Sequence, residues 1–191
     1  VRIPDQGQIF LDQSAFSISF WMKAPASMFP TSNSTDYYLL CKGSIGTDAS
    51  IGSTGKRFDL EFKNKTLRFA IDDADDANGG GKDELSADAT PFFTGDWVNV
   101  VLIRDTAEKQ LRVYLNTALV GETSISKATS GIGEATDLIL GNIGARELFG
   151  GSTPAPYKGM LDEFKIYNYA LSYTDIVTEY YGSPVALKPF D

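Results

Sequence analysis

Hydrophobic and polar residues alternate with a period of two over much of this chain. The alternation is regular in residues 16–22, 58–62 and 67–71, and again in 111–122. Such alternation predicts half-buried β-strands, and a short polar turn between two strands predicts a hairpin. Asn64-Lys65 is a turn of this kind. We therefore expect hairpins over residues 58–71 and 111–122.

The other elements follow from departures from this alternation. Residues 98–104 are almost continuously apolar, which predicts a central strand buried on both faces. Only residues 172–180 have a helical pattern, with Ser172 at the N-cap and Asp175 three residues later. Many short strands with so little helix predict an all-β fold. We expect a two-sheet antiparallel sandwich with one short C-terminal helix, forming a single domain over residues 1–191.

Composition excludes several functions. The chain has 17 Lys+Arg against 25 Asp+Glu, a net charge of −8, no histidine and one cysteine, Cys41. A histidine-dependent nucleophile, a zinc site built on His or several Cys, and an intrachain disulfide are thereby excluded. The acidic balance argues against nucleic acid as a partner. No apolar run approaches the about 20 residues of a transmembrane helix, so no transmembrane segment is expected.

Several segments resemble one family. Residues 157–172 are similar to the closing strand and helix entry of laminin G-like, concanavalin A-like lectin-glucanase jelly rolls, including bacterial LamG-type modules. The stretches 16–23, 39–43, 95–100 and 111–116 resemble earlier strands of that family, in the same order. The resemblance implies a jelly-roll sandwich, an extracellular or cell-surface location, and attachment to other domains. Because the chain starts at Val1 rather than Met, we expect it to be cut from a longer protein whose neighbouring domains are partners.

Asp162 is the candidate metal ligand. Strict alternation over Met160, Asp162, Phe164 and Ile166 places its carboxylate on the apolar face. A buried carboxylate must be paired, hydrogen-bonded or metal-bound. One solution is a structural Ca²⁺, which binds about six to eight oxygens and which many members of the resembled family carry. Asp5 is the candidate second ligand, if the two ends of the domain pair. The alternative is that Asp162 accepts N–H bonds from a neighbouring loop.

A first group of candidate ligand-binding residues lies at the loop rim. The loops of residues 43–55 and 72–83 are long for strand connections, and long loops often carry function. Asp72 and Asp73 lie where the second loop begins, and Tyr37-Tyr38 forms an aromatic segment. Carboxylates accept hydroxyl hydrogen bonds and aromatic rings stack on sugars, so these residues suit a glycan. The alternative is a solvated hairpin tip.

Tyr114 and Tyr167 form a second group, on the polar faces of their strands. Exposed there, they would offer a glycan platform on a sheet surface. They could equally pack beneath the Ser172 helix. We expect the rim residues to matter more than Tyr114.

These features favour a non-catalytic carbohydrate-binding module, and therefore not an enzyme. The alternative is an architectural or adhesive module that binds no sugar. A glycoside hydrolase is the remote alternative, because such enzymes place two carboxylates on one strand face. Asp59 and Glu61 alternate in this way, but Lys63 follows on the same face and no Glu-x-Asp-x-x-Glu pattern is present. We interpret them as a solvated or salt-bridged edge.

Overall fold

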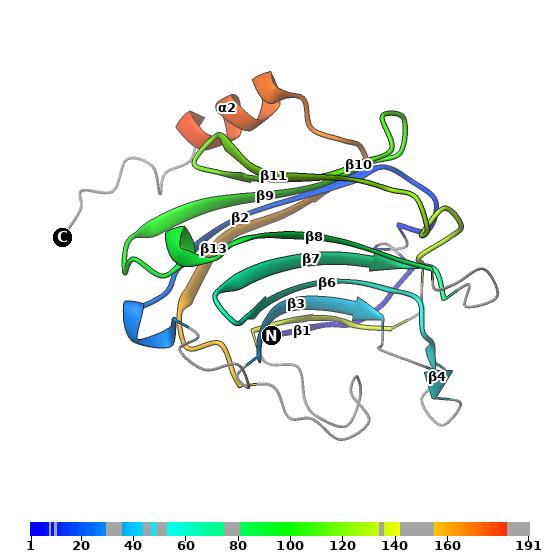
Figure 1. Cartoon of the computed structure of the whole chain (residues 1–191), viewed down its shortest axis with the longest axis horizontal. Helices are drawn as coiled ribbons and strands as arrows, with labels where there is room; N and C mark the ends of the chain where they lie inside the picture. The colour runs from blue at the N-terminus through cyan, green and yellow to red at the C-terminus, as the bar shows by residue number, and fades with distance from the viewer. Residues whose placement is uncertain are drawn as a thin grey trace.

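The chain forms two stacked antiparallel sheets (Figure 1). The computed structural model describes all residues except 8, 10, 30–35, 44–46, 49–52, 75–80, 134–135, 142–154 and 183–191, and the side chains of 47, 48, 53 and 54. A six-stranded sheet has the order β1-β12-β3-β6-β7-β8, and a five-stranded sheet has the order β11-β10-β9-β2-β13. This sandwich confirms the predicted fold class.

The six-stranded sheet contains β1 (Arg2–Ile3), β12 (Leu138–Leu140), β3 (Asp36–Gly43), β6 (Arg57–Lys63), β7 (Thr66–Asp72) and β8 (Lys82–Asp88). The five-stranded sheet contains β11 (Ala118–Ser124), β10 (Gln110–Leu115), β9 (Trp97–Asp105), β2 (Phe16–Lys23) and β13 (Met160–Tyr167). Two short strands, β4 (Thr47–Asp48) and β5 (Ser53–Thr54), pair with each other. Within the described residues the helical elements are the 3-10 turns η1 (Ala26–Met28) and η3 (Thr90–Phe92), and the helix α2 (Tyr173–Gly182).

The apolar positions of the alternating strands meet between the sheets. Phe16 of β2 packs against Phe58 of β6 and Phe69 of β7, with ring centroids 5.2 Å and 6.5 Å away. Each of these three residues is at most 2% exposed to solvent. Burying such large side chains stabilises each by about 2 kcal/mol, so the core holds the sheets together without disulfides. Both predicted hairpins form, β6–β7 and β10–β11.

Helix α2 lies on the outer face of the five-stranded sheet (Figure 1). Its Ile176, with Leu171, packs on Val101 and Ile103 of β9. The covering helix explains why β9 is buried on both faces, as its apolar run predicts. The predicted N-cap is present: the amide of Asp175 donates to Ser172 Oγ at 3.2 Å, and the Ser172 amide donates to Asp175 Oδ2 at 2.9 Å.

The six-stranded sheet is curved. In Figure 1 strands β3, β6 and β7 arch toward the five-stranded sheet, so the outer face of the six-stranded sheet is its concave face. No helix in the described ranges is long and apolar enough to cross a membrane.

Candidate functional site

The concave face carries a dense set of charged and polar side chains. Phe58, Leu60 and Phe62 of β6 point into the core, so the residues between them point outward. Residues directly opposite each other on neighbouring strands share a face of the sheet. The residues of β3, β7 and β8 that align with the outward positions of β6 therefore also point outward. We name the resulting surface the polar face. Its members are Tyr38, Arg57, Asp59, Glu61, Arg68, Asp72, Lys82 and Glu84.

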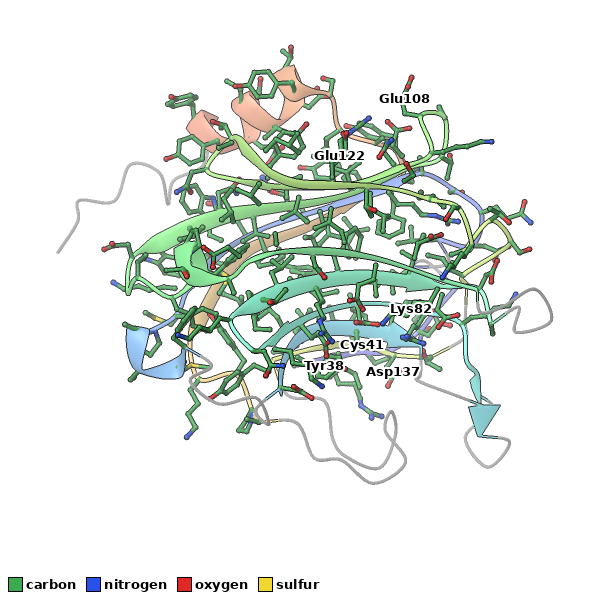
Figure 2. The ribbon with its side chains drawn as sticks, in the orientation of Figure 1. Tyr38, Cys41, Lys82, Glu108, Glu122 and Asp137 are labelled. Atoms are coloured by element: carbon green, nitrogen blue, oxygen red, sulfur yellow. The ribbon has the colours of Figure 1, made fainter. Side chains whose placement is uncertain are left out.

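Figure 2 shows Tyr38 and Lys82 on the side of the six-stranded sheet that faces away from the five-stranded sheet. Cys41 lies between them and is buried against Tyr38 and Ile139. Its burial agrees with the small apolar role expected of a lone cysteine inside a strand.

Arg57 organises one half of the polar face. Its Nε lies 2.9 Å from Asp59 Oδ2, and its Nη1 lies 2.6 Å from Asp72 Oδ2. Burial acts to lower the pKa of Arg57, but the two carboxylates outweigh burial and raise it. The guanidinium is therefore a permanent cation that fixes both acids in place.

Glu61 and Tyr38 organise the other half. Arg68 Nη1 lies 3.3 Å from Glu61 Oε1. Burial, together with a hydrogen bond to Glu61, raises the pKa of Tyr38 well above its ordinary value, so the phenol stays protonated. Burial also raises the pKa of Asp59 to about 6, although Arg57 opposes the shift.

Accessibility divides the polar face into two parts. Arg57, Asp59 and Glu61 are each less than 7% exposed. The side chains toward the β8 edge are open to solvent: Lys82 is 42% exposed, Arg68 30% and Glu84 24%. Arg68 Nε lies 3.5 Å from Glu84, which also pairs with Lys82. A ligand would therefore meet this strip, supported from below by the buried ion pairs.

The structure separates the predicted rim residues. Tyr38 and Asp72 belong to the polar face, where Asp72 contacts Arg57. Tyr37 points inward, packs against the core and bridges to Ala155. Asp73 is buried and accepts a hydrogen bond from the Ser130 amide at 2.8 Å. Asp72 and Asp73 therefore do not share one surface, and their role in ligand binding stays a prediction. Parts of the two long loops, residues 44–46, 49–52 and 75–80, lie outside the described residues.

Tyr114 and Tyr167 do not form an open platform. Both are half-buried and pack on the cluster of Val101, Ile103 and Ile176 beneath α2. Burial raises the pKa of Tyr167, helped by a hydrogen bond to Glu179 of the helix. The alternative of packing under the Ser172 helix is the observed one.

Asp162 is not on the apolar face. A β-bulge between Asp162 and Lys165 inserts an extra residue, with Glu163 at a φ of +48°. The bulge shifts the alternation, so Leu161, Phe164 and Ile166 pack on the core. Asp162 lies opposite Trp21 on the outer side of the five-stranded sheet, and its Oδ1 accepts the Glu163 amide at 2.9 Å.

Asp5 lies two residues after β1 of the other sheet, beside Lys42. Its Oδ1 is 3.2 Å from the buried Lys42 Nζ, and its amide donates to Asp137 Oδ1 at 3.0 Å. Within the described ranges no three acidic or thiol side chains are grouped as a metal site would require. Asp162 and Asp5 thus form no common cluster there, and the argument for calcium from a buried Asp162 no longer holds. Calcium itself stays a prediction.

The sequence interpretation missed most of the polar face. The alternation of Asp59 and Glu61 is visible in the sequence, but with Lys63 it indicates a solvated or salt-bridged edge, and nothing in the sequence singles out Arg57. Asp59 and Glu61 are salt-bridged but not at an edge, because β6 lies between β3 and β7. The strand β8, which supplies Lys82 and Glu84, has only one large apolar residue, Leu85, and was not predicted.

The concave polar face is therefore one surface of a two-sheet jelly-roll sandwich. The chain belongs to the concanavalin A-like lectin/glucanases superfamily: the Laminin_G_3 family model matches residues 1–177. No curated protein sequence matches the chain.

Solved structures share the fold. The CBM40 of Ruminococcus gnavus IT-sialidase, bound to α2,3 sialyllactose, has a TM-score of 0.62 and 20% identity, covering 88% of this chain and 83% of that one. The botulinum neurotoxin serotype D ligand-binding domain in complex with N-acetylneuraminic acid has a TM-score of 0.62 and 18% identity. The match covers 88% of this chain and 36% of that one. The binding domain of Paraclostridial Mosquitocidal Protein 1 has a TM-score of 0.63 and 18% identity. The match covers 94% of this chain and 40% of that one. The chain thus spans well under half of the toxin domains.

Proposed function

We propose that this chain is a non-catalytic carbohydrate-binding module of an extracellular or cell-surface protein, and that a glycan binds across the polar face. The observation that carries the proposal is the exposed strip of Arg68, Lys82 and Glu84 on a concave sheet, backed by buried ion pairs. Guanidinium and carboxylate groups are planar and hydrogen-bond well to the hydroxyls of a sugar ring. The buried pairs hold them in position, so little entropy is lost on binding.

Two kinds of relative support the proposal. The superfamily comprises lectins and glucanases. Two domains of the same fold have structures with sialic acid or a sialylated sugar. Domains of this kind belong to larger proteins, which favours neighbouring domains as the other partners of the chain. The proposal includes a structural Ca²⁺ that stabilises the domain.

The polar face favours binding over catalysis. A glycosidase needs two carboxyl groups that reach the glycosidic bond. Asp59 and Glu61 have a suitable alternation, and the pKa of Asp59 near 6 would suit a general acid. However, they are only 3% and 6% exposed, and each is held by an arginine. Neither carboxyl group is free to approach a sugar.

A glycan array followed by titration calorimetry tests the proposal. Arg68→Ala should weaken binding of the array's best glycan by about tenfold or more, because a hydrogen bond to a charged group is lost. Asp72→Ala should weaken it by at least about 1 kcal/mol, because Arg57 loses a partner. Arg112→Ala is the matched control: this arginine also pairs with two carboxylates, Asp105 and Glu122, but on the five-stranded sheet.

The outcomes are distinct. Loss of binding in Arg112→Ala with none in Arg68→Ala would move the site to the five-stranded sheet. Absence of any glycan on the array would favour the architectural alternative. Hydrolysis of a bound glycan by the same preparation would contradict the non-catalytic assignment.

A further inference from the structure

A polar cleft lies at the seam where the two sheets meet, beside the polar face. Strand β8 is an edge strand of the six-stranded sheet, and β11 is an edge strand of the five-stranded sheet. The two edge strands contact each other but form no ladder. The cleft has a volume of about 510 Å³. Its lining is polar and comes from both strands and the segment after β11: Lys82, Asp83, Glu84, Thr123, Ser124, Ser126 and Lys127.

The wall of the cleft is rigid because Asp83 fixes it. The Asp83 carboxylate accepts the amides of Ser126, Lys127 and Ala128 at 3.0, 2.8 and 2.7 Å, and its other oxygen accepts Ser126 Oγ at 3.1 Å. Gly121 of β11 lets the strands approach closely, since a Cβ there would lie 2.8 Å from Leu85 Cδ2. The cleft therefore exists before any ligand arrives.

The charges in the cleft favour an anion. Four hydrogen bonds already satisfy the Asp83 carboxylate. Glu84 is shared between Lys82 and Arg68, and Arg68 also pairs with Glu61, so these two cations and two carboxylates balance. The Lys127 ammonium is exposed and has no ion pair or hydrogen bond within the described part of the chain. The lining thus has two lysines and two carboxylates, and Lys127 is the charged group among them that no described residue pairs with, so it is free to meet an anion.

Uncommitted hydroxyl groups lie beside these cations. The side chains of Thr123 and Ser124 make no hydrogen bond to any described residue, and they line the same cleft as Lys127. Hydroxyl groups both donate and accept, so they suit the hydroxyls of a sugar ring. An anionic group on the sugar would then lie against the ammonium groups.

We propose that this cleft binds a negatively charged sugar residue, so that the preferred ligand of the module is an acidic glycan. This inference rests on the proposed function: Lys82 and Glu84 belong to both surfaces, so a glycan on the polar face continues over the β8 edge into the cleft. Lys82 and Lys127 bind the anionic group, and Thr123 and Ser124 bind ring hydroxyls.

Amide NMR titrations of the whole chain test the proposal with monosaccharides. Sodium glucuronate and glucose 6-sulfate carry the two common anionic groups, glucose is the neutral match, and sodium acetate is the anion without a sugar. At constant ionic strength, both acidic sugars should shift the amides of 82–84 and 123–127 saturably, with the tighter of the two identifying the preferred group. Glucose and acetate should bind at least about tenfold more weakly, since each lacks one set of contacts.

The double variant Lys82→Gln/Lys127→Gln should weaken binding of the acidic sugars by about tenfold or more. Lys63→Gln is the control, because Lys63 lies on the same sheet but pairs with Asp36 away from the cleft. The amide spectrum of each variant shows directly whether it is folded.

Each other outcome overturns the proposal in a recognisable way. Equal binding of glucose would make the cleft a neutral-sugar site and leave the proposed function intact. Equal binding of acetate would show an adventitious ion only. Shifts confined to amides of β6 and β7 would keep the glycan on the polar face alone. Absence of any sugar shift, together with an empty glycan array, would remove the proposed function as well.

Discussion

The raised pKa of Asp59 makes the stability of the protein depend on pH, and Asp59→Asn isolates that dependence. Asp59 titrates near pH 6 when folded, against an ordinary value of 3.8, because burial disfavours its charged form. Between these values the folded state holds a proton that the unfolded state has released. Raising the pH therefore destabilises the fold through this group. Its contribution is complete below about pH 4 and is lost above about pH 6.

The magnitude follows from the size of the shift. Each pKa unit corresponds to about 1.4 kcal/mol, so a shift of about two units is worth about 3 kcal/mol. The side chain is only 5% exposed, so solvent screening reduces this free energy little. Other carboxylates titrate in the same range, so the relevant quantity is the stability difference between the wild type and Asp59→Asn. That difference should fall by about 3 kcal/mol between pH 4 and pH 7.

Urea unfolding, followed by tryptophan fluorescence at several pH values and constant salt, measures this difference. Glu122→Gln is a suitable control, because Glu122 pairs with Arg112 on the exposed side of the other sheet and is itself 44% exposed. A difference between wild type and Asp59→Asn that stays flat from pH 4 to pH 7 would refute the reasoning. A difference that grows with pH would show that Arg57 lowers the pKa instead of merely opposing burial.

Two further predictions concern stability. Asp83→Ala should lower the free energy of unfolding by about 3 kcal/mol in the same urea assay, because it leaves the amides of 126–128 without their acceptor; an unchanged value would mean that water replaces the carboxylate. If a structural Ca²⁺ is bound, a chelator should lower the melting temperature, and Asp162→Ala should abolish that sensitivity. A variant as sensitive as the wild type would exclude Asp162 as a ligand, and the same comparison with Asp5→Ala tests the second candidate.

Local patterns predicted the parts of the fold that depend on nearby residues. The alternation of Phe58, Leu60 and Phe62 placed β6 correctly, because a strand with one face in the core must alternate. Asn64 and Lys65 marked the β6–β7 turn, where both residues have positive φ. Ser172 marked the start of the C-terminal helix through its hydrogen bonds with Asp175.

The errors concern features that no local pattern encodes. Alternation gives the two faces of β6 but not its neighbours in the sheet, so Asp59 and Glu61 were placed at an edge. A bulge changes the phase of alternation at one residue, and Asp162 was misplaced because the positive φ of Glu163 has no sequence signal. Strand β8 was missed because it is held mainly by pairing with β7 rather than by its own apolar residues.

The polar face contributes little to stability, and this bears on why it exists. Buried ion pairs often stabilise no more than apolar residues of the same volume, because desolvation cancels their attraction. At neutral pH the burial of Asp59 weakens the fold. A sheet surface built for stability alone would place apolar residues where Asp59 and Glu61 are buried. Retention of charges at such a cost is typical of functional sites, where side chains are positioned for a ligand. Glycan binding at the adjoining strip of Arg68 and Lys82 is the role that would account for it.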